Sequence, residues 1–348
     1  MPHSRNEPTP LVCSRPWTSF RIDDHKGNIK PCCWTKLEFG NINDQNIDDI
    51  WNGAPYVRMR ELMAKGKLDT ICASDCPVLL GEFPESEAGD EPTSQKCKEN
   101  WLLQQEEISA RSTILKSRPT KMRIVPTVKC NLNCEFCYQD RNDTTELPAD
   151  IDRILEDFFP ILDELVIIGG EPLATRECLK IIEQMDPRKY PDLHLALITN
   201  GNTVGDHIVK LLLTRQISWV LVSVDAASPE TYERVRGGNF RKVIEGVTRL
   251  NYIRHQQQKI WGLLMGFIFM RSNMHEALDF VKLAQELRVD FTFQPVFGNW
   301  HNETYYHLPD EVERARKIVE ELDTYLAAIG LGEKKKTERL HLKLKSAA

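Results

Sequence analysis

The sequence predicts an α/β protein, namely a partial (β/α)6 barrel of parallel strands with a small amino-terminal cysteine-rich metal-binding domain. From Lys121 onward, short β-branched runs alternate with amphipathic helical stretches. Six of the ten cysteines fall before residue 100, and an acidic, proline-containing stretch at 82–95 has the composition of an exposed connector. We therefore expect a cysteine-rich domain at 10–98, a core domain at 120–300, and a carboxyl-terminal helix and tail at 301–348.

The amino-terminal domain is expected to contain a β-hairpin over residues 18–34, with its turn at Asp23 to Gly27. This hairpin would fold Cys32 back toward the segment that carries Cys13. Cys72 and Cys76 are spaced i, i+4, which puts both on one face if that stretch is helical. Two pairs of thiols would then form one metal site with four ligands.

The core domain reads as six strand–helix units in succession. Helices between consecutive strands predict a parallel sheet, because parallel strands need crossover connections, and these place all the carboxyl ends of the strands on one face. In such architectures the ligand site lies at those ends. The expected strands are 122–128, 164–170, 194–200, 219–226, 261–270 and 290–298, and the expected helices are 150–162, 174–185, 204–216, 240–253, 273–287 and 309–329.

Composition excludes several classes of function. Lys and Arg total 45 against 51 Asp and Glu, a net charge of -6, so a nucleic-acid partner is not expected. The longest apolar run, 261–270, is too short to cross a bilayer, and the first residues contain no apolar signal segment. We expect a cytoplasmic protein without membrane contact, whose cysteines stay reduced and available for metals.

Three of the cysteines, Cys130, Cys134 and Cys137, lie within eight residues directly after the first core strand. Three thiolates leave one iron of a cubane cluster without a protein ligand, and a substrate or cosubstrate can bind at that position. The alternative is a structural zinc site, but such a site requires four protein ligands, and no fourth Cys or His lies close by. An iron–sulfur cluster is therefore the better interpretation.

The segment KCNLNCEFCYQD resembles the CxxxCxΦC signature of the radical S-adenosylmethionine (SAM) superfamily, with Phe136 in the aromatic place. The resemblance implies a [4Fe-4S] cluster held by the three cysteines, with SAM bound to the fourth iron. In this family the reduced cluster cleaves SAM into methionine and a 5′-deoxyadenosyl radical, which abstracts hydrogen from the substrate.

The resemblance also implies SAM contacts at the ends of the next three strands. Gly169, Gly170 and Glu171 match the family's GGE motif, which holds the SAM ammonium; they are alternatively a tight strand-to-helix turn. Asn200 and Ser223 match positions that face the ribose; they are alternatively a turn residue and a strand residue. Arg236 matches the arginine that pairs with the SAM carboxylate, and Arg234 is its nearby competitor. No clear GxIxGxxE motif is found, so the adenine contacts are not assigned.

The amino-terminal cysteine pattern resembles the SPASM and shorter twitch domains, which carry auxiliary iron–sulfur clusters but usually follow the barrel. It implies a second [4Fe-4S] cluster on Cys13, Cys32, Cys72 and Cys76. Structural zinc is the alternative, because four cysteines suit both metals, and disulfides are the third interpretation. Cys33 could replace Cys32, and Cys97 could be an extra ligand.

Two functions follow from these patterns. The first is a SAM-cleaving enzyme that takes an electron from a donor such as flavodoxin or ferredoxin; related SPASM and twitch enzymes act on peptides, sugars or cofactor precursors. The second is a non-catalytic iron–sulfur or zinc protein that uses the same barrel for electron transfer or partner binding. The sequence favours the enzyme, because the cysteine signature, Gly169 to Pro172 and an arginine near strand four are all present. It does not identify the substrate.

Overall fold

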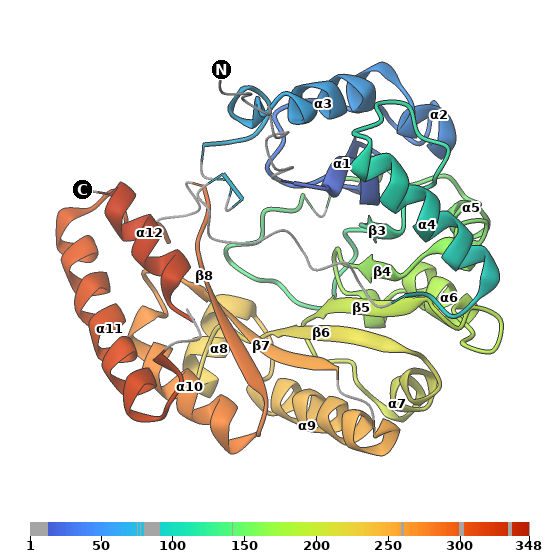
Figure 1. Ribbon diagram of the computed structural model, residues 1–348. Helices are drawn as coiled ribbons and strands as arrows, with labels where there is room; N and C mark the ends of the chain where they lie inside the picture. The colour runs from blue at the N-terminus through green and yellow to red at the C-terminus, as the bar shows by residue number, and fades with distance from the viewer. Residues whose placement is uncertain are drawn as a thin grey trace, which may run out of the picture. The chain divides into compact units, whose positions relative to one another are not determined.

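The computed structural model describes residues 13–74, 76, 78–79, 91–140, 142–258, 261–298, 303–332 and 336–347 (Figure 1). Most of the expected connector at 82–95 lies outside these residues. The strand order in the sheet is β2-β1-β3-β4-β5-β6-β7-β8. The chain divides into two compact units, the first formed by residues 1–127, 144–169 and 180–195, and the second by residues 128–143, 170–179 and 196–348.

The first unit contains the predicted hairpin. Strands β1 (Ser19–Ile22) and β2 (Ile29–Lys30) pair antiparallel, and Gly27 in the turn has a φ of 86°. β1 also pairs in parallel with β3 (Lys121–Ile124), which in turn pairs in parallel with β4 (Glu164–Ile167). The hairpin prediction is confirmed, but the sequence did not indicate that the hairpin would extend the parallel sheet.

An aromatic cluster forms the core of the first unit beside this hairpin. Phe20 of β1 stacks on Tyr56, with ring centroids 6.1 Å apart, and the Trp51 ring lies 4.9 Å from Tyr56. The buried guanidinium of Arg60 lies 4.6 Å from the Trp51 ring centroid, a cation–π contact. The helices of this unit are α1 (Arg15–Thr18), α2 (Ile47–Trp51), α3 (Ala54–Ala64), α4 (Gln95–Ser109) and α5 (Ile151–Glu156).

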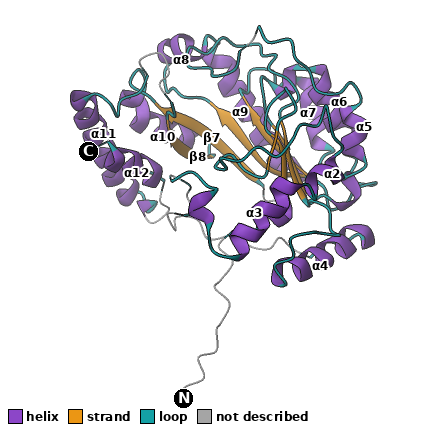
Figure 2. Ribbon diagram, turned by 90° about the horizontal axis from the view of Figure 1, so that it is seen from above, coloured by secondary structure: helices purple, strands orange, loops and turns teal. Residues whose placement is uncertain are grey.

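The second unit contains three parallel strands, β6 (Ile217–Ser223), β7 (Gly262–Phe269) and β8 (Asp290–Pro295). Phe280 of α10 packs against Phe267 and Phe293, which shows that one face of β7 and β8 is covered by this helix. The helices of this unit are α7 (Asp206–Leu213), α8 (Pro229–Arg236), α9 (Phe240–Gln257), α10 (Ala277–Glu286), α11 (Pro309–Ala328) and α12 (Glu338–Ser346). α11 and α12 lie side by side in both ribbon views (Figures 1 and 2).

The predicted alternation of strands and helices is confirmed. Each of the six expected core strands is present as β3 to β8, and each is followed by at least one helix. β5 (His194–Thr199) and α6 (Arg176–Gln184) have residues in both units. Among the described residues, no helix combines the length and the apolar character needed to span a bilayer.

Candidate functional site

The cysteine loop, residues 130–137, belongs to the second unit and has no regular secondary structure. All three of its thiols are partly exposed. The backbone amide of Leu132 donates to Sγ of Cys130 at 3.5 Å, and the amide of Cys137 donates to the carbonyl of Cys134 at 3.3 Å. The loop is thus folded back on itself, and its three cysteines remain partly exposed.

Two glycines permit the close approach of backbone to this loop. A Cβ atom on Gly170 would lie 2.0 Å from the carbonyl oxygen of Lys129, so any side chain there would displace the start of the loop. Gly237 ends α8 in the left-handed conformation, with a φ of 63°, and a Cβ there would lie 3.0 Å from the carbonyl oxygen of Asn133. The amide of Glu135 also donates to the carbonyl of Val235, which joins the loop to the last turn of α8.

Glu171 is fully buried, and its carboxylate accepts three hydrogen bonds. Oε1 accepts from the amide of Leu173 at 2.9 Å and from the hydroxyl of Thr199 at 2.6 Å, and Oε2 accepts from the amide of Asn200 at 2.6 Å. Burial raises the pKa of Glu171 although these hydrogen bonds oppose the rise. The carboxylate therefore joins the turn after Gly170 to the carboxyl end of β5.

Asn200 links the end of β5 to the cysteine loop. Its Nδ2 donates to Oδ1 of Asn131 at 2.8 Å and lies 3.8 Å from Sγ of Cys130. The predicted site residue Ser223 is half-buried at the end of β6 and makes no side-chain hydrogen bond within the described part of the chain. Gly169 belongs to the first unit and is in a left-handed conformation with a φ of 137°.

Arg236 is buried at the end of α8 and is bound mainly by Asp225, which was not among the predicted SAM contacts. Its Nε donates to Oδ2 of Asp225 at 2.8 Å, and its Nη2 lies 2.7 Å from the same oxygen in an ion pair. Its Nη1 lies 3.7 Å from Sγ of Cys134, and the guanidinium carbon lies 5.7 Å from the Phe136 ring centroid. Asp225 lies two residues after the end of β6, and a carboxylate at a strand end was the signal that could have identified its role. The competitor Arg234 is exposed and donates to the carbonyl of Ser272.

The donor set of the cysteine loop fits an iron–sulfur cluster. Burial raises the pKa of Cys134, and the charge of Arg236 opposes this rise, so the guanidinium favours a thiolate. Among the described residues, no group of three or more His, Cys, Asp or Glu side chains has the geometry to hold one metal ion. A cubane distributes its protein ligands over separate irons, so its thiolates do not need to converge on one point as they do around zinc.

The amino-terminal cysteines form a second group, in the first unit. Cys13, Cys32, Cys72 and Cys76 are all buried. Burial, together with smaller contributions from the charges of Cys32, Cys76 and Cys13, raises the pKa of Cys72 to about 12. The donor set of four thiols suits either an iron–sulfur cluster or zinc.

The segment of Cys72 is joined to the segment that follows Cys33 by strand-like pairing and not by a helix. Thr35 and Cys72 form an antiparallel bridge, and the amide of Ala73 donates to the carbonyl of Trp34 at 2.7 Å. The described residues between Cys72 and Cys76 form turns and this bridge, and not a helix. The helical spacing that would have put both cysteines on one face is therefore not present there. The thiol of Cys33 is exposed, whereas Cys97 lies in α4 and its thiol donates to the carbonyl of Ile161.

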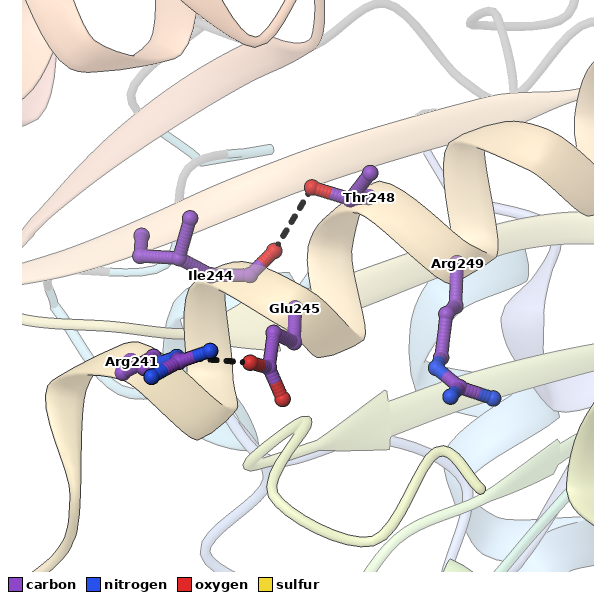
Figure 3. A pocket seen from close by; sticks show the side chains of 5 residues that line it. All are labelled: Arg241, Ile244, Glu245, Thr248 and Arg249. Atoms are coloured by element: carbon purple, nitrogen blue, oxygen red, sulfur yellow. Dashed lines mark hydrogen bonds and ion pairs between the residues drawn. The ribbon is translucent and has the colours of Figure 1, made fainter. Parts of the chain in front are cut away.

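A separate surface depression lies on the outer side of α9 in the second unit (Figure 3). It is lined by five side chains of this one helix, including Arg241 and Glu245, which pair at 2.9 Å. Arg249 at its edge pairs with Asp206 of α7. None of the five is a thiol or a predicted site residue, so this depression is not part of the candidate site.

The fold and the two cysteine groups define the class of protein. Residues 124–284 match the model of the radical SAM superfamily, and residues 13–77 match the SPASM model, an iron-sulfur cluster-binding domain. The chain therefore contains a radical SAM domain preceded by a SPASM domain, and both predictions are confirmed. These domains imply a [4Fe-4S] cluster with SAM and an auxiliary cluster.

Similar curated proteins include enzymes named as GTP 3′,8-cyclases. The probable GTP 3′,8-cyclase of Methanococcus vannielii is 27% identical over 203 residues, which are 56% of this chain and 66% of that protein. The GTP 3′,8-cyclase of Hydrogenovibrio crunogenus is 33% identical over 136 residues, which are 36% of this chain and 40% of that protein. The chain thus spans between 40% and 66% of the length of these two relatives.

Among solved structures, the fold is similar to that of SuiB from Streptococcus suis. The TM-score is 0.50 at 16% sequence identity, and the match covers 78% of this chain and 58% of that chain. At this identity the likeness concerns the fold alone.

Proposed function

We propose that this chain is a radical SAM enzyme that cleaves SAM reductively and uses the product to abstract hydrogen from a substrate. When bound, the cluster and SAM supply an electron and a 5′-deoxyadenosyl radical. The observation that carries the proposal is the gathering, in one compact unit, of the three thiols of the cysteine loop with Glu171, Asn200 and Arg236. The match to the radical SAM model over the same residues supports it.

Within this proposal, the side chains of the chain have distinct roles. The thiolates of Cys130, Cys134 and Cys137 bind three irons and leave the fourth for SAM. Glu171 holds the amide of Asn200 in place, and Asn200 in turn contacts the loop through Asn131. The contacts of SAM with Phe136, Gly169, Gly170, Glu171, Asn200, Ser223 and Arg236 are part of the proposal.

The amino-terminal module is proposed to hold an auxiliary [4Fe-4S] cluster on Cys13, Cys32, Cys72 and Cys76. Their common burial supports this ligand set over one with the exposed Cys33. A fully ligated cluster has no position for SAM, so its role would be electron transfer or substrate positioning. The proposed domain limits are 10–98 for this module, 120–300 for the core, and 301–348 for the carboxyl-terminal helix and tail.

A radical SAM enzyme needs a reductant and a substrate. We propose flavodoxin or ferredoxin as the electron donor and a peptide or small metabolite as the substrate. The names of the curated relatives make GTP the first small molecule to test. A cytoplasmic location belongs to the same proposal, because a reducing compartment keeps thiols available to iron.

The test is anaerobic reconstitution with iron and sulfide, followed by dithionite reduction and measurement of 5′-deoxyadenosine released from SAM. Wild-type protein should release it, and single alanine variants of Cys130, Cys134 and Cys137 should release none. Cys178→Ala is the matched control, because Cys178 is buried in α6 and is not a predicted ligand. A wild-type protein that binds iron without cleaving SAM would support the non-catalytic alternative and refute the enzyme.

A further inference from the structure

The three nitrogens of the Arg236 guanidinium are divided between two partners, Asp225 and Cys134. Oδ2 of Asp225 holds two of the three guanidinium nitrogens, Nε by a hydrogen bond at 2.8 Å and Nη2 by an ion pair at 2.7 Å. The third, Nη1, is left for Sγ of Cys134 at 3.7 Å. Because a guanidinium is planar and rigid, the direction of Nη1 is determined once the other two nitrogens are bound. The carboxylate therefore decides where the remaining donor points.

The carboxylate is itself held by elements other than α8. Its Oδ1 accepts from the amide of Ile268 in β7 at 2.6 Å. The side chain of Asn273 donates to the carbonyl of Asp225 and to that of Ile268, each at 2.9 Å. Asp225 has a φ of 58°, a left-handed conformation that aspartate and asparagine tolerate better than most residues. Asp225 is thus anchored independently of the arginine that it binds.

We infer that Asp225 is a positioning residue that directs Arg236 onto Sγ of Cys134, and that this hydrogen bond raises the reduction potential of the cluster that Cys134 ligates. The inference rests on the proposed function, because it requires that cluster. Hydrogen bonds to sulfur and nearby positive charge are among the factors that set iron–sulfur potentials. Both stabilise the more negative, reduced cluster, so their loss makes reduction harder.

The redox step concerned is the addition of one electron to the oxidised cluster by an external one-electron reductant, dithionite in the experiment. No bond is broken and no proton is transferred. Arg236→Gln removes the charge and the Nη1 donor together. At a fixed solution potential, the ratio of oxidised to reduced cluster should rise about tenfold. For a one-electron couple this corresponds to a reduction potential lower by about 59 mV.

Asp225→Asn distinguishes positioning from a simple effect of charge. Both carboxylate oxygens accept hydrogen bonds, and an amide has only one acceptor. Since the amide of Ile268 is fixed in β7, the Asn oxygen stays there and its NH₂ group faces the guanidinium, which turns away from Cys134. Positioning therefore predicts a lower potential, whereas loss of a negative charge with Arg236 still in place predicts a higher one.

The experiment is a redox titration followed by electron paramagnetic resonance, read from the signal that changes when SAM is added. That response identifies the SAM-binding cluster, because the fully ligated auxiliary cluster should not respond. Asp225→Asn and Arg236→Gln should lower the potential by similar amounts, and the double variant should fall no further than Arg236→Gln. Arg234→Gln, on the same helix but exposed and bound to Ser272, is the charge-matched control and should match the wild type.

A further variant, Arg236→Lys, keeps a cation that can pair with Asp225 inside the fold. A single ammonium cannot reach both Asp225 and Cys134, so the potential should still fall. A potential in Asp225→Asn or in Arg236→Lys equal to or above that of the wild type would overturn the inference and leave the proposed function intact. A wild-type protein without a SAM-responsive cluster would instead refute the proposed function itself.

Discussion

Replacing Glu171 by alanine should lower the free energy of unfolding of the protein, and not only remove a contact with SAM. The carboxylate is fully buried and accepts from three donors, the amides of Leu173 and Asn200 and the hydroxyl of Thr199. An unsatisfied buried donor costs about 1 to 3 kcal/mol, and water entering the space left by the side chain offsets part of this cost. At the lower limit for each donor, the free energy of unfolding should fall by about 3 kcal/mol.

The assay is urea unfolding of the cluster-free protein, followed by circular dichroism, with Glu177→Ala as the control. Glu177 is 46% exposed and pairs with Lys129 at 3.1 Å, and such surface ion pairs contribute about 0 to 1 kcal/mol. Glu171→Ala should therefore unfold at a clearly lower urea concentration than Glu177→Ala. Equal midpoints, together with a loss of SAM affinity only in Glu171→Ala, would show that Glu171 serves the ligand and not the fold.

Three further predictions concern the two clusters and the stability at acid pH. The triple alanine variant of the cysteines in the loop 130–137 should retain about four irons after anaerobic reconstitution, from the auxiliary cubane; one zinc or no metal would contradict it. Gly170→Ala should lose the iron of the SAM-binding cluster, whereas Gly205→Ala, with no atom within 4 Å of the new Cβ, should keep it. The hydrogen bond from Lys180 lowers the pKa of Asp152, so this group stabilises the fold at neutral pH and ceases to do so as the pH falls through its folded pKa. The unfolding midpoint should therefore drop less on acidification in Asp152→Asn than in the wild type; equal drops would refute this.

The cysteine pattern and the strand–helix alternation were readable from the sequence because both are local. Three cysteines within eight residues constrain one loop whatever surrounds it, and hydrophobic periodicity identified each of the six strands from β3 to β8. The hairpin of residues 18–34 was also local, since turn residues lie between two apolar runs. Its parallel pairing with β3 was not readable, because β1 and β3 are about a hundred residues apart in sequence and the pairing depends on tertiary packing.

The candidate site shows the same division between local and tertiary information. The sequence indicated Glu171 and Arg236 by their motifs, but only the structure gave their partners. The role of Asp225 was not predicted, because it depends on a guanidinium eleven residues along the chain and on the amide of Ile268 in another strand.

The sequence by itself determined the class of this protein, since the spacing of its thiols and the order of its strands set which chemistry and which topology are available. The tertiary structure decided which donors each charged group meets. A buried carboxylate or guanidinium must satisfy its hydrogen bonds within the protein, so Glu171 binds the backbone around β5, and Arg236 is directed by Asp225 onto Cys134.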